Sequence, residues 1–191
     1  MGLKKYIQKR NFDKTPEPKG RVHSNNTHRF YIQKHAASHL HYDFRLELDG
    51  VLKSWAVPKG PSLDPKIKRL AMHVEDHPLE YGTFEGIIPK GEYGGGTVML
   101  WDEGTWEPLD DDPAKAYKNG HLRFNLHAQK LQGRWDLIHF KKEDNSWFLI
   151  KYSDEFASSD EDITKEEPDS VLTQQSIEEI AKNHDATWTK E

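Results

Sequence analysis

The sequence has no cysteine among its 191 residues. This absence excludes disulfide bonds, thiolate metal sites and a cysteine nucleophile, so histidine and carboxylate side chains remain as the strong metal ligands. The sequence contains eleven histidines that could serve as such ligands. Long apolar runs are also missing: none approaches the roughly 20 residues that span a bilayer, and none follows the N-terminal Met-Gly-Leu-Lys-Lys-Tyr. We therefore expect no secretory signal, no membrane partner and a cytoplasmic location.

Two types of catalytic loop are missing as well. No strained strand-to-helix turn presents a serine nucleophile. The glycine-rich run at 91–96 lacks the lysine and the following helix of a phosphate-binding P-loop, so it predicts a turn between two strands.

Charge is distributed unevenly along the chain, although the formal net charge is only -5. Residues 1–70 hold 15 Lys and Arg against 6 Asp and Glu, whereas residues 151–191 hold 4 against 12. A basic first third in a chain with a mild overall charge favours a polyanion bound on one surface. The alternative is an ordinary solubilising excess of lysine.

The segment 39–49 alternates polar and apolar residues without a break. Because successive side chains of a β-strand point to opposite faces, this alternation predicts a half-buried strand. The apolar face is expected to pack a core, and the other face to carry the chemistry. The polar face comprises His39, His41, Asp43, Arg45, Glu47 and Asp49.

We predict a mainly β fold, a compact antiparallel β-barrel with short peripheral helices. Turn signals such as Asp49-Gly50 separate eight short runs of strand character. Closure into a barrel removes exposed strand edges, and an open sandwich is the main alternative. A short helix over a barrel end is expected between Asp112 and Gly120. The predicted strands are 29–33, 39–48, 51–57, 70–75, 97–101, 122–126, 133–140 and 147–152.

Composition divides the chain, at this length a single globular domain, into three parts. Residues 1–26 are basic and have no apolar period, which predicts an extended arm. Residues 27–152 hold the predicted barrel. Residues 153–191 are expected to form a mobile acidic linker and then a short helix that opens with a capping box at Ser176.

Two histidines and one carboxylate are candidate metal ligands. His41 and Asp43 share a strand face, and a short bend after His35 would bring that residue back towards them. Three protein ligands leave coordination positions open for water and substrate, as a catalytic metal requires, and this donor set suits manganese, iron or zinc. Arg45 has the planar fork that fits a phosphate, although pairing with Glu47 or Asp43 is its alternative.

Further candidates lie downstream. His77 is suited to protonate a leaving alkoxide or to donate to a phosphoryl oxygen, and Tyr81 to add a hydrogen bond, with plain packing as the alternative for this tyrosine. Lys59 and Arg69 flank a turn and would extend the positive surface towards a nucleic-acid backbone, unless they are only solvated surface charges.

Five stretches carry a family resemblance: Gln33 to Gly50 (QKHAASHLHYDFRLELDG), Leu52 to Pro61 (LKSWAVPKGP), Glu75 to Tyr81 (EDHPLEY), Phe84 to Gly86 (FEG) and Ile88 to Gly94 (IPKGEYG). Through them, and from about residue 10 to residue 152, the sequence closely resembles the 3′-phosphoesterase module of bacterial and archaeal DNA ligase D. Ligase and polymerase motifs do not accompany it, so the chain resembles a stand-alone version of that module.

The resemblance implies a compact β-barrel that heals DNA 3′ ends during break repair by non-homologous end joining. The implied cofactor is Mn2+, with Zn2+ or Co2+ as other candidates. The implied reactions are removal of a 3′-terminal phosphate and, in members with both activities, of a 3′-terminal ribonucleoside. The matching motifs assign the metal to His35, His41 and Asp43. They assign the scissile phosphate to Arg45 and His77, and supporting roles to Tyr81, Lys59 and Arg69.

The N-terminal stretch extends the resemblance. Arg10 and Glu17 fall in a Lys-Arg-Asn-Phe and Thr-Pro-Glu-Pro pattern that resembles the functional arm of the family. Asn11 stands where an aspartate is common in that pattern. This departure weighs more against ribonucleoside removal than against phosphate removal. The implied partners are DNA 3′ ends, in primer-templates or duplexes, and a separate DNA ligase, polymerase and Ku-like end-binding protein, with a nucleoid-associated location.

Two other functions compete with this interpretation. Two histidines and a carboxylate on a barrel also describe the facial triad of iron oxygenases. A non-catalytic module that binds DNA ends through its basic arm would show salt-sensitive binding without turnover.

Overall fold

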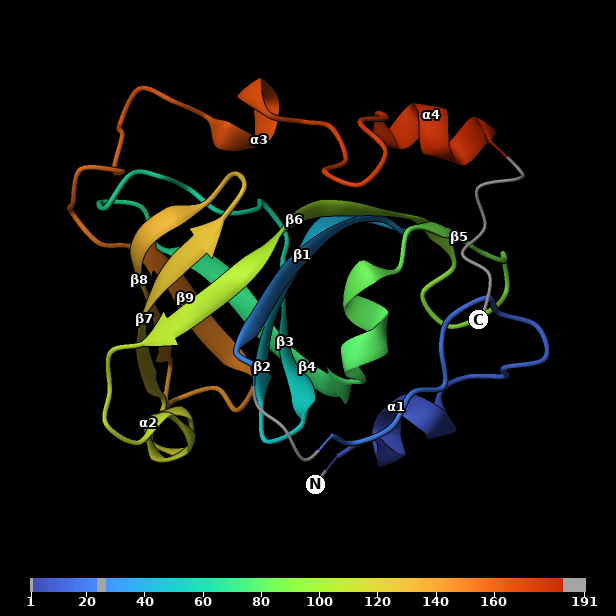
Figure 1. Ribbon diagram of the computed structural model, residues 1–191, viewed down its shortest axis with the longest axis horizontal. Helices are drawn as coiled ribbons and strands as arrows, with labels where there is room; N and C mark the ends of the chain where they lie inside the picture. Colours follow the sequence, from blue (N-terminus) through green and yellow to red (C-terminus); the bar gives the residue numbers. More distant parts are fainter. Residues whose placement is uncertain (1, 24–26, 184–191) are drawn as a thin grey trace.

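In the computed structural model, which describes residues 2–23 and 27–183, the chain folds into a closed antiparallel β-barrel (Figure 1). Its eight strands follow the order β1-β2-β3-β4-β9-β8-β7-β6, and pairing of β6 with β1 closes the ring. The strands are β1 (Arg29–Ala36), β2 (Leu40–Leu48), β3 (Val51–Val57), β4 (Arg69–His77), β6 (Gly96–Pro108), β7 (His121–Ala128), β8 (Gln132–His139) and β9 (Ser146–Lys151). A further short strand, β5 (Gly86–Ile88), pairs with the start of β6. The predicted barrel is confirmed, and the closed ring excludes the sandwich.

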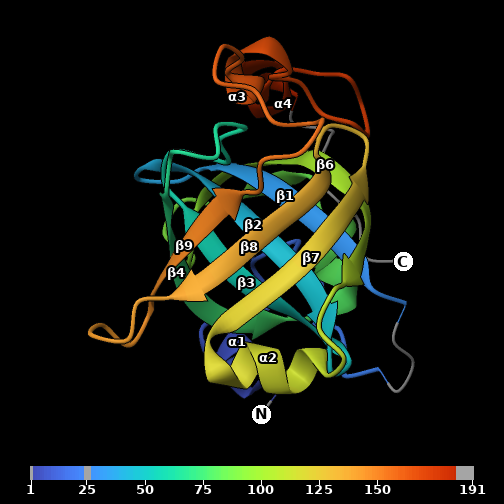
Figure 2. The same cartoon turned by 90° about the vertical axis from the view of Figure 1, so that its left-hand side faces the viewer.

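Five short helices surround the barrel: α1 (Lys4–Gln8), the 3-10 helix η1 (Leu79–Thr83), α2 (Pro113–Asn119), α3 (Ile163–Glu166) and α4 (Ile177–Lys182). Helix α2 lies across one end of the barrel, as Figure 2 shows, and matches its prediction. Its N-cap Asp112 accepts a hydrogen bond from the Lys115 amide, and Gly120 ends it in the left-handed region with φ 85°. Among residues 2–23 and 27–183, no helix has both the length and the apolar character to cross a membrane.

The apolar side of β2 fills the barrel interior. Phe44 and Leu46 are at most 1% exposed and pack with Trp55 of β3 and Phe124 of β7 in one large core cluster. Burying each such side chain contributes about 1.5–3 kcal/mol, so this row anchors the sheet. Because residues 39–49 alternate, the polar side chains between these apolar ones point outward from the barrel.

The polar side of β2 is also buried, contrary to the half-buried strand predicted from the alternation. Asp43, Arg45 and Glu47 are 7%, 2% and 0% exposed. The outer face of β1 to β3 is covered by η1, by the N-terminal segment and by the chain around β5, which bring two small apolar clusters of their own. The prediction was wrong because alternation reports the two faces of a strand but not what other segments place over them. The result is an enclosed polar pocket on the outside of the barrel.

The N-terminal part is not a fully extended arm. It contains α1, whose Tyr6 is fully buried and donates its hydroxyl hydrogen to the Pro18 carbonyl. A helix of five residues is too short to produce a visible apolar period, which explains why the sequence did not reveal it. The predicted boundary at residue 26 lies outside the described residues.

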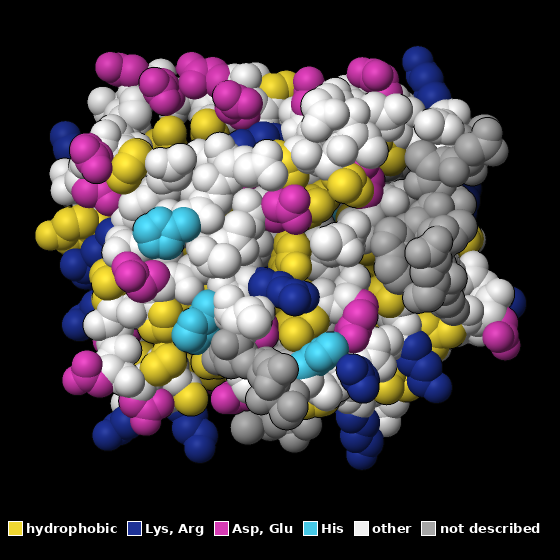
Figure 3. Space-filling model, in the orientation of Figure 1, with side chains coloured by type: hydrophobic (Ala, Val, Ile, Leu, Met, Phe, Trp, Pro, Cys, Tyr) yellow, Lys and Arg dark blue, Asp and Glu magenta, His cyan; other side chains and the backbone are white. Residues whose placement is uncertain are grey.

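The C-terminal part packs on the barrel and is not a detached linker. The capping box at Ser176 and helix α4 are confirmed. The preceding segment contains α3, however, and Ile163, Ile177 and Ile180 join the barrel core. These three isoleucines supply the apolar surface that holds the segment on the barrel, and the acidic composition of the segment gave no sign of it. The segment lies over the end of the barrel opposite α2 (Figures 1 and 2), and acidic side chains line that edge of the surface in Figure 3. Residues 184–191 of the predicted unit lie outside the described residues.

Candidate active site

Three candidate metal ligands converge on the outer face of β1 and β2. The strand register places His35 opposite His41 and Gln33 opposite Asp43, so the side chains share one face. One ligand atom from each of His35, His41 and Asp43 lies within 4.8 Å of the others. Oδ2 of Asp43 is 3.6 Å from Nδ1 of His35 and 3.3 Å from Nε2 of His41.

Main-chain carbonyls orient both imidazoles. The Nε2–H group of His35 donates to the Gly94 carbonyl at 2.7 Å, and the Nδ1–H group of His41 donates to the His39 carbonyl at 3.0 Å. The other nitrogen of each ring then faces Asp43. A histidine that donates one N–H to a carbonyl and directs the other nitrogen at a shared point is the usual arrangement of metal-ligating histidines.

The charges of this cluster favour a positive occupant. Burial opposes ionisation of Asp43, but Arg45, His35 and His41 outweigh it and hold the pKa of the carboxyl well below its usual range. Burial also lowers the pKa of His41, yet the hydrogen bond and the charge of Asp43 outweigh burial and raise that pKa above its ordinary value. A divalent cation held by these residues would compete with a proton for the His41 nitrogen that faces Asp43. The residues present therefore fit a metal ion with nitrogen and oxygen ligands.

Arg45 is fixed beside the metal ligands. Its Nε donates to Oε1 of Gln33 at 2.7 Å, and one terminal nitrogen donates to Oγ of Ser54 at 2.8 Å. The other terminal nitrogen lies 3.5 Å from Asp43, and the guanidinium lies 5.0 Å from the centre of the Tyr81 ring. These contacts leave Arg45 in one orientation, with a guanidinium edge directed into the pocket. Of the two predicted alternatives, Asp43 is a partner of this arginine.

The N-terminal segment brings a second arginine to the same place. Nε of Arg10 donates to Oε2 of Glu17 at 2.9 Å, and one terminal nitrogen donates to the Tyr6 carbonyl at 3.1 Å. Glu17 is fully buried and also accepts from the Thr15 hydroxyl at 2.9 Å. The other terminal nitrogen of Arg10 lies 3.4 Å from Nε2 of His77. Glu17 therefore positions Arg10 at the pocket.

His77 and Tyr81 complete the polar wall. The Nδ1–H group of His77 donates to the Glu75 carbonyl at 2.9 Å, which leaves Nε2 as an acceptor. Burial, with Arg45 and Arg10 nearby, holds the pKa of His77 well below its ordinary value, so this imidazole is neutral. Burial raises the pKa of Tyr81 well above 10, so its phenol keeps a proton to donate.

A pocket of about 270 Å³ brings eight of the ten predicted site residues together. They are Arg10, Glu17, His35, His41, Asp43, Arg45, His77 and Tyr81. Lys59 and Arg69 do not line it. Lys59 is exposed in the turn after β3, and Arg69 begins β4 beside the acidic residues 160–162 of the C-terminal segment.

The sequence interpretation did not single out several other residues at the site. Glu75 and Tyr93 line the pocket, and Gln33 holds Arg45. Two of these had a usable signal, because Gln33 precedes His35 and Glu75 precedes His77 by two residues, the spacing of side chains on one face of a strand. Residues 91–96 form the predicted turn, yet they also supply the Gly94 carbonyl that orients His35. No local signal in the sequence indicates that contact.

Chemically, the pocket combines two fixed guanidinium groups, a protonated phenol and three candidate metal ligands. Guanidinium groups and a divalent cation are the groups that proteins use to hold and polarise a phosphoryl group.

Comparisons with known proteins agree with this chemistry. The family model of the DNA ligase D 3′-phosphoesterase domain matches residues 33–139. The multifunctional non-homologous end joining protein LigD of Pseudomonas aeruginosa is 54% identical over 182 residues, which cover 92% of this chain and 22% of that protein. The multifunctional non-homologous end joining DNA repair protein LigD of Mycobacterium tuberculosis is 50% identical over 142 residues, or 71% of this chain and 18% of that protein. The chain thus spans about a fifth of the length of these relatives. Its sequence and its pocket together show that the chain belongs to the DNA ligase D 3′-phosphoesterase family.

Proposed function

We propose that this protein is a metal-dependent phosphoesterase that removes the 3′-terminal phosphate from DNA ends during break repair by non-homologous end joining. The observation that carries the proposal is the convergence of His35, His41 and Asp43 with Arg10 and Arg45 in one pocket. Membership of the phosphoesterase family favours this reaction over the iron-oxygenase alternative.

His35, His41 and Asp43 would hold the metal, for which we propose Mn2+, with Zn2+ or Co2+ as alternatives. When bound, the cation polarises a phosphoryl oxygen and offsets the negative charge of the ester. Arg45 needs no reorganisation to face the same group, because Gln33 and Ser54 already hold it. Preorganised donors of this kind stabilise the charge that develops in the transition state.

His77 has a proton-transfer role in this proposal. In the free protein its Nε2 is an acceptor, so before it can act as a general acid it has to gain a proton. A phosphate monoester has a second pKa near 6, and its monoanion carries such a proton into the pocket. Water would attack the phosphorus as the bond to the 3′ oxygen breaks, which gives inorganic phosphate and a 3′-hydroxyl end. The negative charge of the bound phosphate opposes the effect of Arg45 and Arg10 on His77, so His77 would take that proton and return it to the leaving 3′ oxygen. The phenol of Tyr81 would donate a hydrogen bond to the phosphoryl group.

Removal of a 3′-terminal ribonucleoside is the second candidate activity, and the place of Arg10 and Glu17 in the pocket favours it. Asn11 weighs against it, because it stands where an aspartate is common in the family's N-terminal pattern. For substrates we propose 3′ ends of primer-templates and duplexes, with Lys59 and Arg69 as more distant contacts to the DNA. For partners we propose a separate ligase, polymerase and Ku-like protein.

The test is release of phosphate or of a nucleoside from a primer-template that carries a 3′-phosphate or a single 3′-ribonucleotide, with Mn2+ added. His41→Ala and Asp43→Ala are expected to abolish release and to keep the far-ultraviolet circular dichroism spectrum, because both side chains point away from the barrel core. The exposed His127→Ala and Asp144→Ala are the matched controls. Full activity in His41→Ala or Asp43→Ala refutes the proposed site. Tight, salt-sensitive binding of DNA ends without any metal-dependent turnover supports the non-catalytic alternative.

A further inference from the structure

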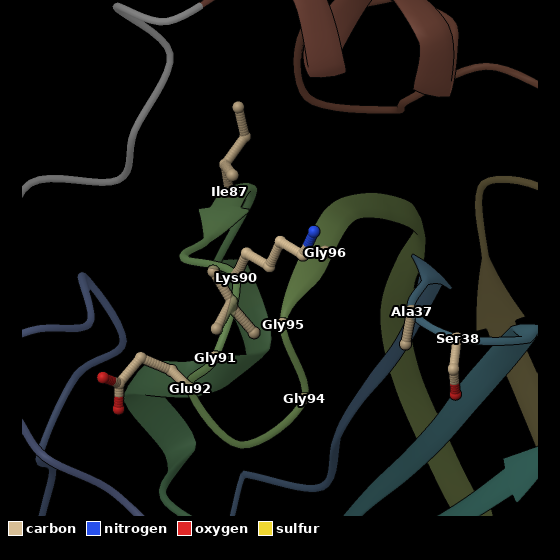
Figure 4. Close-up of a pocket in the computed structure, with 10 residues that line it drawn as sticks. Ala37, Ser38, Ile87, Lys90, Gly91, Glu92, Gly94, Gly95 and Gly96 are labelled. Atoms are coloured by element: carbon tan, nitrogen blue, oxygen red, sulfur yellow. The ribbon is translucent and has the colours of Figure 1, made fainter.

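A second hollow adjoins the active-site pocket. It has a volume of about 510 Å³, nearly twice that of the pocket with the metal ligands. Figure 4 shows its two sides, with Ala37 and Ser38 of the β1–β2 turn on one and the 87–96 segment on the other. Ala37, Ile88 and Gly94 line both cavities, so the two lie side by side.

The walls of this hollow suit an uncharged, partly flat group. Ala37, Ile87 and Ile88 are among its lining residues, although the side chain of Ile87 points away from Ala37 and Ser38 in Figure 4, and glycine backbone forms much of the remainder. Gly91 has φ +94°, and a Cβ atom there would meet nothing within 4 Å, so this part of the wall is open main chain. Apolar walls with main-chain polar groups are typical of sites for small organic ligands, whose volumes run from about 300 to 1,000 Å³.

The hollow also has a positive group for a phosphate. Lys90 lies on its rim and is exposed, and Figure 4 shows its side chain extended along the glycine-rich segment towards Gly96. Glu92 borders the same hollow, but its carboxylate points to the side away from Ala37 and Ser38 in that view. The charge offered to a ligand between the two walls is therefore that of the lysine.

A substrate held at the metal ligands needs such a neighbouring space. A 3′-terminal phosphate is joined through its 3′ oxygen to a sugar and a base, which have to leave the smaller pocket. On other sides that pocket is walled by the side chains of Arg10, Glu17 and Tyr81, which are at most 4% exposed. The adjoining hollow is large enough for a sugar and a base, and Lys90 lines it.

We propose that this hollow binds the 3′-terminal nucleoside of the DNA strand, with Lys90 paired to the phosphate on the 5′ side of that nucleoside. The proposal rests on the proposed function and adds to it a reason why the enzyme acts on a nucleic-acid end and not on any phosphate ester.

A comparison of two substrates in the wild type and two variants tests the base contact. Ser38→Trp fills the hollow from a residue that does not line the metal pocket, and Ser153→Trp places the same side chain at an exposed serine after β9. Each protein receives a 3′-phosphorylated strand with a normal terminal nucleoside, or the same strand with a terminal residue that lacks its base. The rate of phosphate release gives KM and kcat, and fluorescence anisotropy gives Kd for the same strands.

Loss of the base is expected to raise KM about tenfold in the wild type and in Ser153→Trp. In Ser38→Trp the KM of the normal strand is expected to be about tenfold higher than in the wild type. Removing the base is then expected to raise KM by less than about twofold more, because the two changes remove one shared contact. An equal effect of base removal in wild type and Ser38→Trp overturns the proposal.

The Lys90 contact has its own test. Lys90→Gln is expected to raise KM and to reduce the slope of log KM against log salt concentration by about one, whereas the exposed Lys142→Gln leaves that slope unchanged. An unchanged slope in Lys90→Gln refutes the phosphate contact. A wild type that binds these strands but releases no phosphate refutes the proposed function instead, and the anisotropy cycle then still decides whether the hollow holds the base.

Discussion

The fixed orientation of Arg45 gives a quantitative prediction for the charge-conserving variant Arg45→Lys. Lysine keeps the positive charge but cannot donate simultaneously to Gln33 and Ser54 in the plane of a fork. Two charge-assisted hydrogen bonds, at 2.7 and 2.8 Å, are lost or weakened. Each is worth about 1.5–3 kcal/mol, and the new ammonium recovers part of this, so the free energy of unfolding is expected to fall by about 2–4 kcal/mol.

The effect on catalysis is expected to be larger than the effect on folding. If a preorganised guanidinium stabilises the transition state, kcat for release of a 3′-phosphate falls by about 10²–10³-fold in Arg45→Lys, as it does when one such donor is removed from other enzymes. KM is expected to change less, because the charge remains. Urea unfolding and initial rates of phosphate release measure the two effects.

Arg123→Lys is the matched control, because this arginine is exposed on β7 and its guanidinium lies 4.0 Å from Asp110. It should leave both quantities unchanged. If Arg45→Lys keeps kcat within about threefold of the wild type, charge alone suffices at this position. The argument from fixed geometry is then wrong.

Three further predictions concern the rest of the molecule. Burial raises the pKa of Asp102 to about 6, so the folded protein binds its proton more tightly than the unfolded chain, and stability should fall as pH rises from about 4 to 6 by up to about 3 kcal/mol. Asp102→Asn should remove that dependence, and a pH-independent difference between wild type and variant in urea unfolding would show that the carboxylate is ionised throughout. Ile180→Ala should cost about 2–5 kcal/mol, against no change for the half-exposed Leu172→Ala, and equal melting temperatures would mean that α4 does not stabilise the barrel. Mn2+ at about 100 times its Kd should stabilise the wild type by about 2.7 kcal/mol in thermal unfolding and leave His41→Ala unaffected, so an equal shift in both proteins would place the ion elsewhere.

The barrel and the grouping of the candidate metal ligands could be predicted because both depend on local sequence patterns. The alternation on β2 determines which side chains face the core, and it places His41, Asp43 and Arg45 on the opposite side whatever the remainder of the chain does. The position of His35 opposite His41 follows from the pairing of two strands across a short turn. Information of this kind needs only a few neighbouring residues.

The enclosure of the site could not be predicted, because it depends on contacts between distant segments. Tyr6 and Tyr81 come from parts of the chain 75 residues apart, and their rings meet at 5.9 Å over the sheet. Arg10 reaches the pocket only because Glu17 is buried beside it. Lys59 lies near the site in sequence but is exposed in a turn and does not line the pocket. Proximity in sequence therefore does not determine which way a side chain in a turn points.

The hydrogen bond from His35 to the Gly94 carbonyl makes the length of one loop part of the coordination chemistry. The acceptor belongs to the main chain, so replacing side chains at positions 92 or 93 leaves it in place. Inserting or deleting one residue between Pro89 and Gly96 would carry the carbonyl away and free the imidazole to rotate. If His35 holds the metal as proposed, a change in the length of that loop would alter metal affinity without altering any of the proposed ligands.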